Sequence, residues 1–317
     1  MARASPHRID AIRGRGILKC GIWPHVPGFA IEKNGHYSGF DVDICRAVAV
    51  ATLGDPAKVS FVVLDNVKQF AARADIDLAV RRLTWTLGRE SATGMVFGPV
   101  TFYDGQGFLV PRASGTQSAS ELSGQRVCVI DAEHHPKTLY DYFQDQGHPV
   151  QLALVARDDE AEKALDEKRC QAYSADISWL AAARSSFRDG VARYEILPQL
   201  ISKEPLAPLL RAADQDLLQL VQWTIFTLIE AEELGLSSQN IGTVGTGSAR
   251  VRAFLQTHPD SHVALGAGEW VRAVIGAVGN YGELFDRNLG THSALKLDRG
   301  LNRPWSQGGL LYAPPLR

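Results

Sequence analysis

The chain has 317 residues, of which 45% are hydrophobic and 21% are charged, and its formal net charge is -2 at pH 7. This composition is typical of a globular protein long enough for two domains, and it excludes disordered and collagen-like chains. Lys and Arg form no long block, so we expect no nucleic-acid partner. Apolar runs all fall short of the roughly 20 residues that cross a bilayer.

Strand-like and helical patterns alternate in the first part of the chain. The expected elements are strands at 17–22, 59–64 and 78–80, and helices at 41–53 and 67–73. This βαβ order indicates a mainly parallel sheet. Asp41 and Asp43 precede apolar residues at helical spacing, so we interpret them as acids that favour the start of a helix rather than as ligand contacts.

The same alternation repeats after Pro111. The expected elements are strands at 126–130, 151–155 and 170–174, and helices at 138–144 and 159–167. Residues 203–210 then lead into an amphipathic helix at 214–233. We therefore expect two lobes, one formed by 1–108 with 210–317 and the other by 109–209, with the chain crossing between them twice.

The residues after the strand at 78–80 suit the chemistry of a carboxylate. Thr84 and Thr86 offer hydroxyl groups, and the guanidinium of Arg89 can bind both oxygens of a carboxylate at once. A capped helix start with a surface arginine would give the same pattern. The residues by themselves favour the capped helix start.

Eight ordered motifs along nearly the whole chain agree with one family. They lie at residues 16–21, 27–29, 39–49, 84–86, 103–108, 201–206, 279–283 and 299–302. With these motifs the chain resembles the periplasmic amino-acid-binding proteins of ABC transporters (solute-binding protein family 3), in particular the general L-amino-acid-binding branch. The resemblance implies a two-lobed α/β fold of the type II periplasmic-binding-protein kind, with two mixed sheets flanked by helices and joined by a two-strand hinge.

The resemblance also implies a function. The protein would be non-enzymatic, without catalytic residues, cofactor or metal, and would act as a monomer that captures an amino acid or related zwitterion between its lobes. Hinge closure would follow, and the ligand would pass to an ABC permease of the inner membrane. The implied location is the periplasm; because the first eight residues lack the apolar segment of a signal peptide, a cytoplasmic chain or one without its leader stays an alternative.

The resemblance further suggests how the four cysteines pair. Cys20 would bond to Cys45 in one lobe and Cys128 to Cys170 in the other, because each pair joins neighbouring elements of this fold. Four buried thiols, which behave as small apolar side chains, are the alternative.

A free amino acid presents a carboxylate and an ammonium group, and each needs an opposite charge or several hydrogen bonds when it leaves water. By the resemblance, Arg89 with Thr84 and Thr86 would hold the carboxylate, and Asp176 would hold the ammonium. Arg82 would supply further charge or fill the cleft. The residues expected to shape the space for the ligand side chain are Trp23, His25 and Arg82.

The loop at 131–136 departs from the family, which usually has Thr and Gly there. Its Glu133 and His134 are kept as ligand-contact candidates. A metal site is disfavoured because adjacent side chains point apart. With Glu133 and either His134 or His135 as acid and base, the chain would instead be an enzyme of the cyclohexadienyl (arogenate) dehydratase type. A solvated loop, or a divergent copy that senses its ligand, are the remaining interpretations.

Overall fold

The structure, a computed structural model, describes residues 7–132, 134–243, 248–256 and 270–316. The chain divides into two compact units. Unit 1 consists of Met1–Phe102, Leu206–His292 and Leu301–Arg317, and unit 2 consists of Tyr103–Pro205 and Ser293–Gly300. Each unit has its own five-stranded sheet. Across the described residues we find no helix long and apolar enough to cross a membrane.

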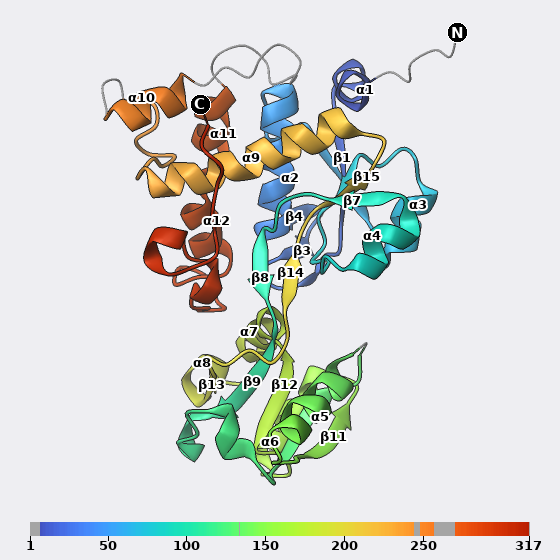
Figure 1. Cartoon of the computed structure of the whole chain (residues 1–317), viewed down its shortest axis with the longest axis vertical. Helices are drawn as coiled ribbons and strands as arrows, with labels where there is room; N and C mark the ends of the chain where they lie inside the picture. The colour runs from blue at the N-terminus through green and yellow to red at the C-terminus, as the bar shows by residue number, and fades with distance from the viewer. Residues whose placement is uncertain (1–6, 133, 244–247, 257–269, 317) are drawn as a thin grey trace. The chain divides into compact units, whose positions relative to one another are not determined.

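The main sheet of unit 1 has the strand order β5-β1-β6-β15-β7, and Figure 1 labels three of these strands, β1, β15 and β7. Its strands are β1 (Leu18–Ile22), β5 (Val59–Val63), β6 (Leu78–Ala79), β7 (Met95–Phe97) and β15 (Leu209–Arg211). β1 is parallel to both β5 and β6, whereas β15 is antiparallel to β6 and β7. The sheet is therefore mixed. A second, antiparallel sheet that the sequence did not predict contains β2 (His25–Val26), β3 (Ala30–Lys33) and β4 (His36–Ser38).

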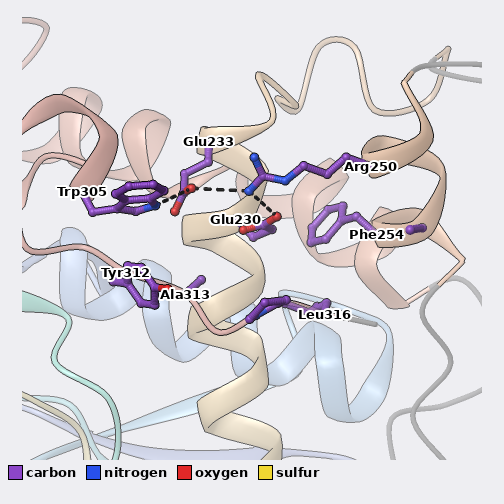
Figure 2. A pocket seen from close by; sticks show the side chains of 10 residues that line it. Glu230, Glu233, Arg250, Phe254, Trp305, Tyr312, Ala313 and Leu316 are labelled. Carbon is purple, nitrogen blue, oxygen red and sulfur yellow. Dashed lines mark hydrogen bonds and ion pairs between the residues drawn. The ribbon is translucent and has the colours of Figure 1, made fainter.

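The central helix of unit 1 is α2 (Phe40–Leu53), in which 12 of 14 residues are buried. A helix that is apolar nearly all round must be covered on every side, and α2 packs against α1, α9, α11, α12 and strand β1. The described helices of this unit are α1 (Arg8–Arg15), α2, α3 (Val67–Ala72), α4 (Leu87–Thr93), α9 (Gln215–Glu233), α10 (Ala249–Leu255), α11 (Trp270–Val278), α12 (Tyr281–Asn288) and η4 (Trp305–Gln307). The C-terminal segment reaches α9, where the indole N–H of Trp305 donates to Glu233 at 3.0 Å (Figure 2).

The sheet of unit 2 has the order β11-β10-β12-β9-β13. Its strands are β9 (Gln106–Pro111), β10 (Arg126–Ile130), β11 (Gln151–Val155), β12 (Ala172–Asp176) and β13 (Tyr194–Ile196). β10 is parallel to β11 and β12, and β9 is antiparallel to β12 and β13. The described helices of the unit are η1 (Arg112–Ser114), η2 (Ala119–Leu122), α5 (His135–Asp145), α6 (Asp158–Asp166), α7 (Ile177–Ser186) and α8 (Gly190–Arg193). The short helix η3 (Gly300–Asn302) begins at the last residue of its second segment and continues into unit 1.

Strand β10 of unit 2 is buried on both faces. Its residues Val127 and Val129 belong to a core cluster with Phe143 of α5, whereas Cys128 and Ile130 belong to a different cluster. Alternate residues of a strand point to opposite faces, so a strand covered on both faces must be apolar almost throughout. This explains why the strand predicted at 126–130 is confirmed at both ends. The strand predicted at 151–155 is also confirmed, as β11 at the edge of the sheet, where Leu154 is 57% exposed.

Two further strands carry the chain between the units. β8 (Phe102–Asp104) and β14 (Glu204–Leu206) form a two-stranded sheet of their own. The predicted pair of connecting strands is therefore confirmed.

Helix α5 starts three residues before the predicted position 138, because Pro136 stands in its first turn, where proline's missing N–H costs nothing.

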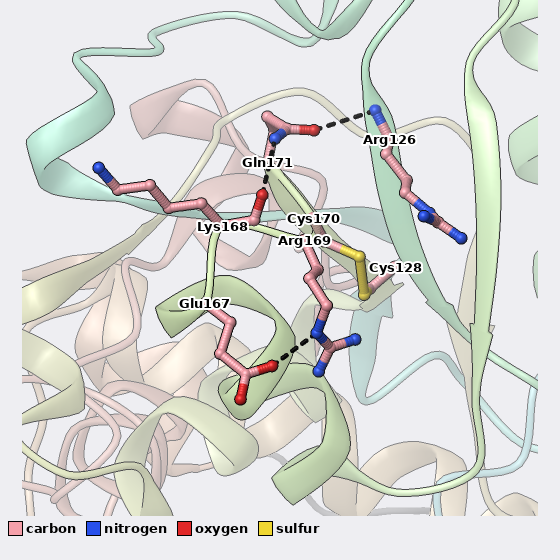
Figure 3. Close-up of a disulfide and its surroundings, with 7 residues drawn as sticks. All are labelled: Arg126, Cys128, Glu167, Lys168, Arg169, Cys170 and Gln171. Carbon is pink, nitrogen blue, oxygen red and sulfur yellow. Dashed lines mark hydrogen bonds and ion pairs between the residues drawn. A yellow bond between two sulfur atoms is a disulfide. The ribbon is translucent and has the colours of Figure 1, made fainter.

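Both predicted disulfides are present. Cys20 of β1 is bonded to Cys45 of α2, and Cys128 of β10 is bonded to Cys170, which lies just before β12 (Figure 3). The second bridge lies beside the Glu167–Arg169 ion pair, whose atoms are 2.6 Å apart. Each bond thus joins elements of one unit, and the alternative of four buried thiols was wrong.

Replacing Cys128 and Cys170 together with alanine should destabilise unit 2. The bridge closes a loop over a sequence separation of 42, and the chain-entropy description assigns a loop of that length about 4 kcal/mol of unfolding free energy. Hydrogen exchange of unit 2 amides in the variant measures the loss. The matched variant without Cys20 and Cys45 should lose protection in unit 1 instead. Unchanged exchange in unit 2 would contradict this assignment.

Candidate binding groups in the two units

The residues predicted from the sequence fall into two groups. Those in unit 1 are Trp23, His25, Arg82, Thr84, Thr86 and Arg89, and those in unit 2 are His134 and Asp176. Glu133, the remaining candidate, lies outside the described residues. The two groups are built in different ways.

In unit 1 a buried acid fixes the backbone beneath the arginines. The side chain of Asp41 lies in the first turn of α2, is 4% exposed, and accepts a hydrogen bond from the backbone N–H of Arg82. Burial raises the pKa of Asp41 to about 7, although Arg82 and Arg81 act to lower it. Arg82 has a φ of 54°, a left-handed conformation that costs about 1–2 kcal/mol for a residue with a side chain. Asp41 therefore does more than favour the start of a helix.

Three guanidinium groups gather at this place. Burial lowers the pKa of Arg81; Asp41 and Asp65 oppose this effect, and the positive charges of Arg89 and Arg82 add to it. The guanidinium carbon of Arg81 lies 5.8 Å from the centre of the Trp23 ring, and that of Arg82 lies 5.1 Å from the centre of the Phe29 ring. Aromatic faces attract cations, so these rings hold the guanidinium groups in place despite their mutual repulsion.

Thr86 and Arg89 are joined by a helix cap. The hydroxyl oxygen of Thr86 accepts from the backbone N–H of Arg89 at 3.2 Å at the start of α4, and Arg89 Nη1 donates to the carbonyl of Thr84 at 2.9 Å. The capped-helix interpretation is therefore confirmed. It does not exclude a ligand, because a hydroxyl that accepts with its oxygen can still donate its hydrogen. The backbone of Thr84 is held by a β-bridge to Leu206.

Trp23 and His25 lie beside the same group. Their ring centres are 5.7 Å apart in an edge-to-face arrangement, and the backbone N–H of His25 donates to the carbonyl of Trp23. Trp23 thus meets the arginines through Arg81, whereas His25 is exposed and adjoins Trp23. The sequence did not single out Arg81. The sequence feature that could have identified Arg81 is its position directly after a buried strand and next to Arg82.

In unit 2 the predicted Asp176 is paired with a histidine. Nε2 of His135 lies 3.0 Å from Oδ1 of Asp176, and Nδ1 lies 2.9 Å from the carbonyl oxygen of Ala132. A carbonyl and a carboxylate both accept hydrogen bonds, so the geometry requires a proton on each ring nitrogen. Burial lowers the pKa of His135, but the hydrogen bond to Asp176 and the charges of Asp176 and Glu204 outweigh it, and the pKa is raised.

His134 forms a second pair of the same kind. Its Nε2 lies 2.9 Å from Oε1 of the buried Glu204, and its ring is stacked on that of His135 with centres 4.9 Å apart. Two stacked histidines therefore stand between two carboxylates. The interpretation of this loop as solvated was wrong for His135, which is 9% exposed, whereas the side chain of His134 is 41% exposed.

A buried amide positions this histidine pair. Nε2 of Gln106 donates to the carbonyl of His135 and to the hydroxyl of Ser174, both at 3.0 Å. The backbone N–H of Gln106 donates to Ser202, whose hydroxyl in turn donates to Glu204 at 3.2 Å. Gln106 thus links both pairs.

Within the described residues, which omit Glu133, no three His, Cys, Asp or Glu side chains are arranged to hold a metal ion.

Changing Asp176 to asparagine should lower the pKa of His135, because burial is then opposed by fewer negative charges. In the native protein the raised pKa means that the pair stabilises unit 2 fully below about pH 6.5, and that this contribution is lost as the pH rises through the folded-state value. NMR titration of the histidine rings measures the shift. Asp141→Asn, on the exposed face of α5, is the control, and an unshifted His135 in D176N would contradict the ion pair.

Three comparisons with known proteins agree with one another. A profile of the bacterial extracellular solute-binding proteins, family 3, matches residues 18–240. The chain is 38% identical to the general L-amino acid-binding periplasmic protein AapJ of Rhizobium johnstonii, and 39% identical to the glutamate/glutamine/aspartate/asparagine-binding protein BztA of Rhodobacter capsulatus. In both cases 99% of this chain and 94% of the relative are covered.

A solved structure extends the likeness to the fold. The periplasmic binding protein of an ABC transporter from Brucella ovis, determined with glutathione bound, superposes with a TM-score of 0.83 at 35% identity, over 99% of this chain and 100% of that one. The resemblance and the two-lobed α/β fold predicted from the sequence are thereby confirmed. The chain belongs to the bacterial extracellular solute-binding proteins of family 3.

Proposed function

We propose that this protein captures an amino acid or a related small zwitterion outside the cytoplasm and passes it to an ABC permease. The observation that carries the proposal is the group of three arginines in unit 1, together with the hydroxyls of Thr84 and Thr86. Relatives named as amino-acid-binding periplasmic proteins cover nearly the whole chain, and two disulfides suit an oxidising compartment such as the periplasm.

The arginine group would bind the ligand carboxylate. Arg89 would contribute a charge-assisted bond, which adds on the order of 1.5–3 kcal/mol, and Thr86 would donate its hydroxyl hydrogen. In unit 2, Asp176 would hold the ammonium, with His135 fixing the direction of its carboxylate. Binding in this way requires no catalytic group, and we expect the ligand to be released unchanged.

The balance of charge favours an acidic ligand. Arg81, Arg82 and Arg89 carry three positive charges. Of the two acids that act on Arg81, Asp65 and Asp41, the second has a pKa of about 7 and supplies less than one full negative charge near neutral pH, so positive charge is in excess. A partly buried cationic group is stabilised by a ligand that brings negative charge. Acidic amino acids, or a peptide-like acid with two carboxylates, would therefore bind more tightly than neutral or basic amino acids.

A thermal unfolding panel tests the ligand class. Ligand at about 100 times its dissociation constant should add about 2.7 kcal/mol of stability, so L-glutamate, L-aspartate or glutathione should raise the melting temperature more than L-leucine or L-lysine. A larger shift with L-lysine would contradict the charge argument. If no compound raises the melting temperature, the protein is a divergent copy that no longer binds amino acids. The enzyme alternative is tested separately, because mass spectrometry of a sample that contains arogenate would reveal any conversion.

Changing Arg89 to methionine should weaken the best ligand of that panel about tenfold or more, because one charge-assisted bond is lost. Arg73→Met removes a surface arginine of unit 1 that is paired with Asp75, and it should leave the affinity unchanged. Calorimetric titration of both variants gives the comparison. Equal affinity in R89M and R73M would show that Arg89 does not contact the ligand.

A further inference from the structure

Unit 1 contains a pocket that shares no residue with the binding groups described above. Its volume is about 470 Å³, which is within the range of small-molecule sites. Figure 2 shows side chains that enter it from α9 (Glu230 and Glu233), from α10 (Arg250 and Phe254) and from the C-terminal segment (Trp305 and Tyr312). Three stretches of sequence that are far apart in the chain thus build one cavity.

The pocket holds two acids and one base among its described lining residues. Nη2 of Arg250 lies 2.9 Å from Oε1 of Glu230 and 3.6 Å from Oε2 of Glu233. The glutamate side chains are only 8% and 4% exposed, respectively, whereas that of Arg250 is 59% exposed. One negative charge in this nearly buried pair is therefore left without a matching cation in the described part of the pocket.

The hydrogen bonds of Glu233 support this view. Its Oε2 accepts from the indole N–H of Trp305 at 3.0 Å, but its buried Oε1 has no hydrogen-bond partner within the described residues. Burial raises the pKa of Glu233, and the charge of Glu230 raises it further, against the hydrogen bond from Trp305 and the charge of Arg250. A buried carboxylate with an unfilled acceptor is unfavourable unless another positive group approaches.

Aromatic rings stand at the mouth of the same pocket. Trp305 and Tyr312 have ring centres 5.7 Å apart, and the two residues are 53% and 63% exposed. Exposed rings beside a negative charge are the surroundings in which proteins bind organic cations, through the ring faces and the carboxylates together. The walls formed by Phe254 and Leu316 are buried and apolar, which suits an alkyl chain better than a hydrated metal ion.

We propose that this pocket binds a small organic cation, an alkylguanidinium or alkylammonium compound without a carboxylate. The cationic head would lie beside Glu230 and Glu233 and the ring faces of Trp305 and Tyr312, and the alkyl chain would lie against Phe254 and Leu316. A carboxylate in this pocket would be repelled by both glutamates. The pocket therefore selects against the zwitterions and acids that we propose as ligands of Arg89 and Asp176.

Calorimetric titration of the full chain with agmatine tests the proposal, because agmatine has a guanidinium at one end of an alkyl chain, an ammonium at the other end and no carboxylate. We expect saturable binding of one molecule per chain, with an affinity that rises with pH as Glu233 loses its proton. N-butylurea, which has a similar planar head without charge, should not bind. The absence of saturable agmatine binding, or equal binding of the urea, would overturn the proposal.

Variants locate the binding in this pocket. Glu233→Gln should weaken the binding of agmatine at least about tenfold through loss of a charge-assisted contact. The control is Glu232→Gln, which removes the neighbouring charge of α9. Because Glu232 does not line the pocket, this variant should bind agmatine with unchanged affinity. If E233Q does not fold, Ala253→Phe fills the pocket from an exposed helical position and should abolish binding. Equal affinity in the native protein and in the pocket variant that folds would place agmatine elsewhere.

Discussion

The candidate binding group of unit 1 depends on one buried hydrogen bond, from the backbone N–H of Arg82 to the carboxylate of Asp41. Asp41 belongs to the most deeply buried helix of the unit, so the position of its carboxylate is set by the core and not by the surface. The bond holds Arg82 in a left-handed conformation that an arginine adopts only at a cost. The same carboxylate opposes the charges of Arg81 and Arg82. Without it, three guanidinium groups would repel one another in a partly buried place.

Unit 2 also holds its polar groups in place through contacts of its own. The carboxylates of Asp176 and Glu204 each lie within hydrogen-bond distance of one of two stacked histidines, and Gln106 donates to the carbonyl of His135. The groups in each unit are thus positioned before any ligand arrives. Preorganised charges of this kind lose little entropy on binding, which favours affinity. The pocket lined by Glu230 and Glu233 differs in sign from the arginine group, because its excess charge is negative.

The sequence predicted those features that depend on local pattern. The strands at 126–130 and 151–155 follow from continuous apolar runs, whereas the binding role of Arg89, based on a donor set that matches a carboxylate, stays a prediction. Both disulfide pairs were predicted through the resemblance to a known fold. Asp41 and His135 could not be predicted, because their roles arise from partners 41 residues away in each case, Arg82 and Asp176. An acid at a helix start and a histidine in a polar loop look alike in sequence whether they are solvated or buried.

The two disulfides join the cysteines in the order in which they occur, first with second and third with fourth. As the chain lengthens during synthesis or export, Cys20 and Cys45 are both present before Cys128 appears. Oxidation that simply follows the order of emergence therefore produces the native bonds, with no need for slow exchange between wrongly paired thiols. A protein of this design can mature wherever an oxidant is present, without help from a disulfide isomerase.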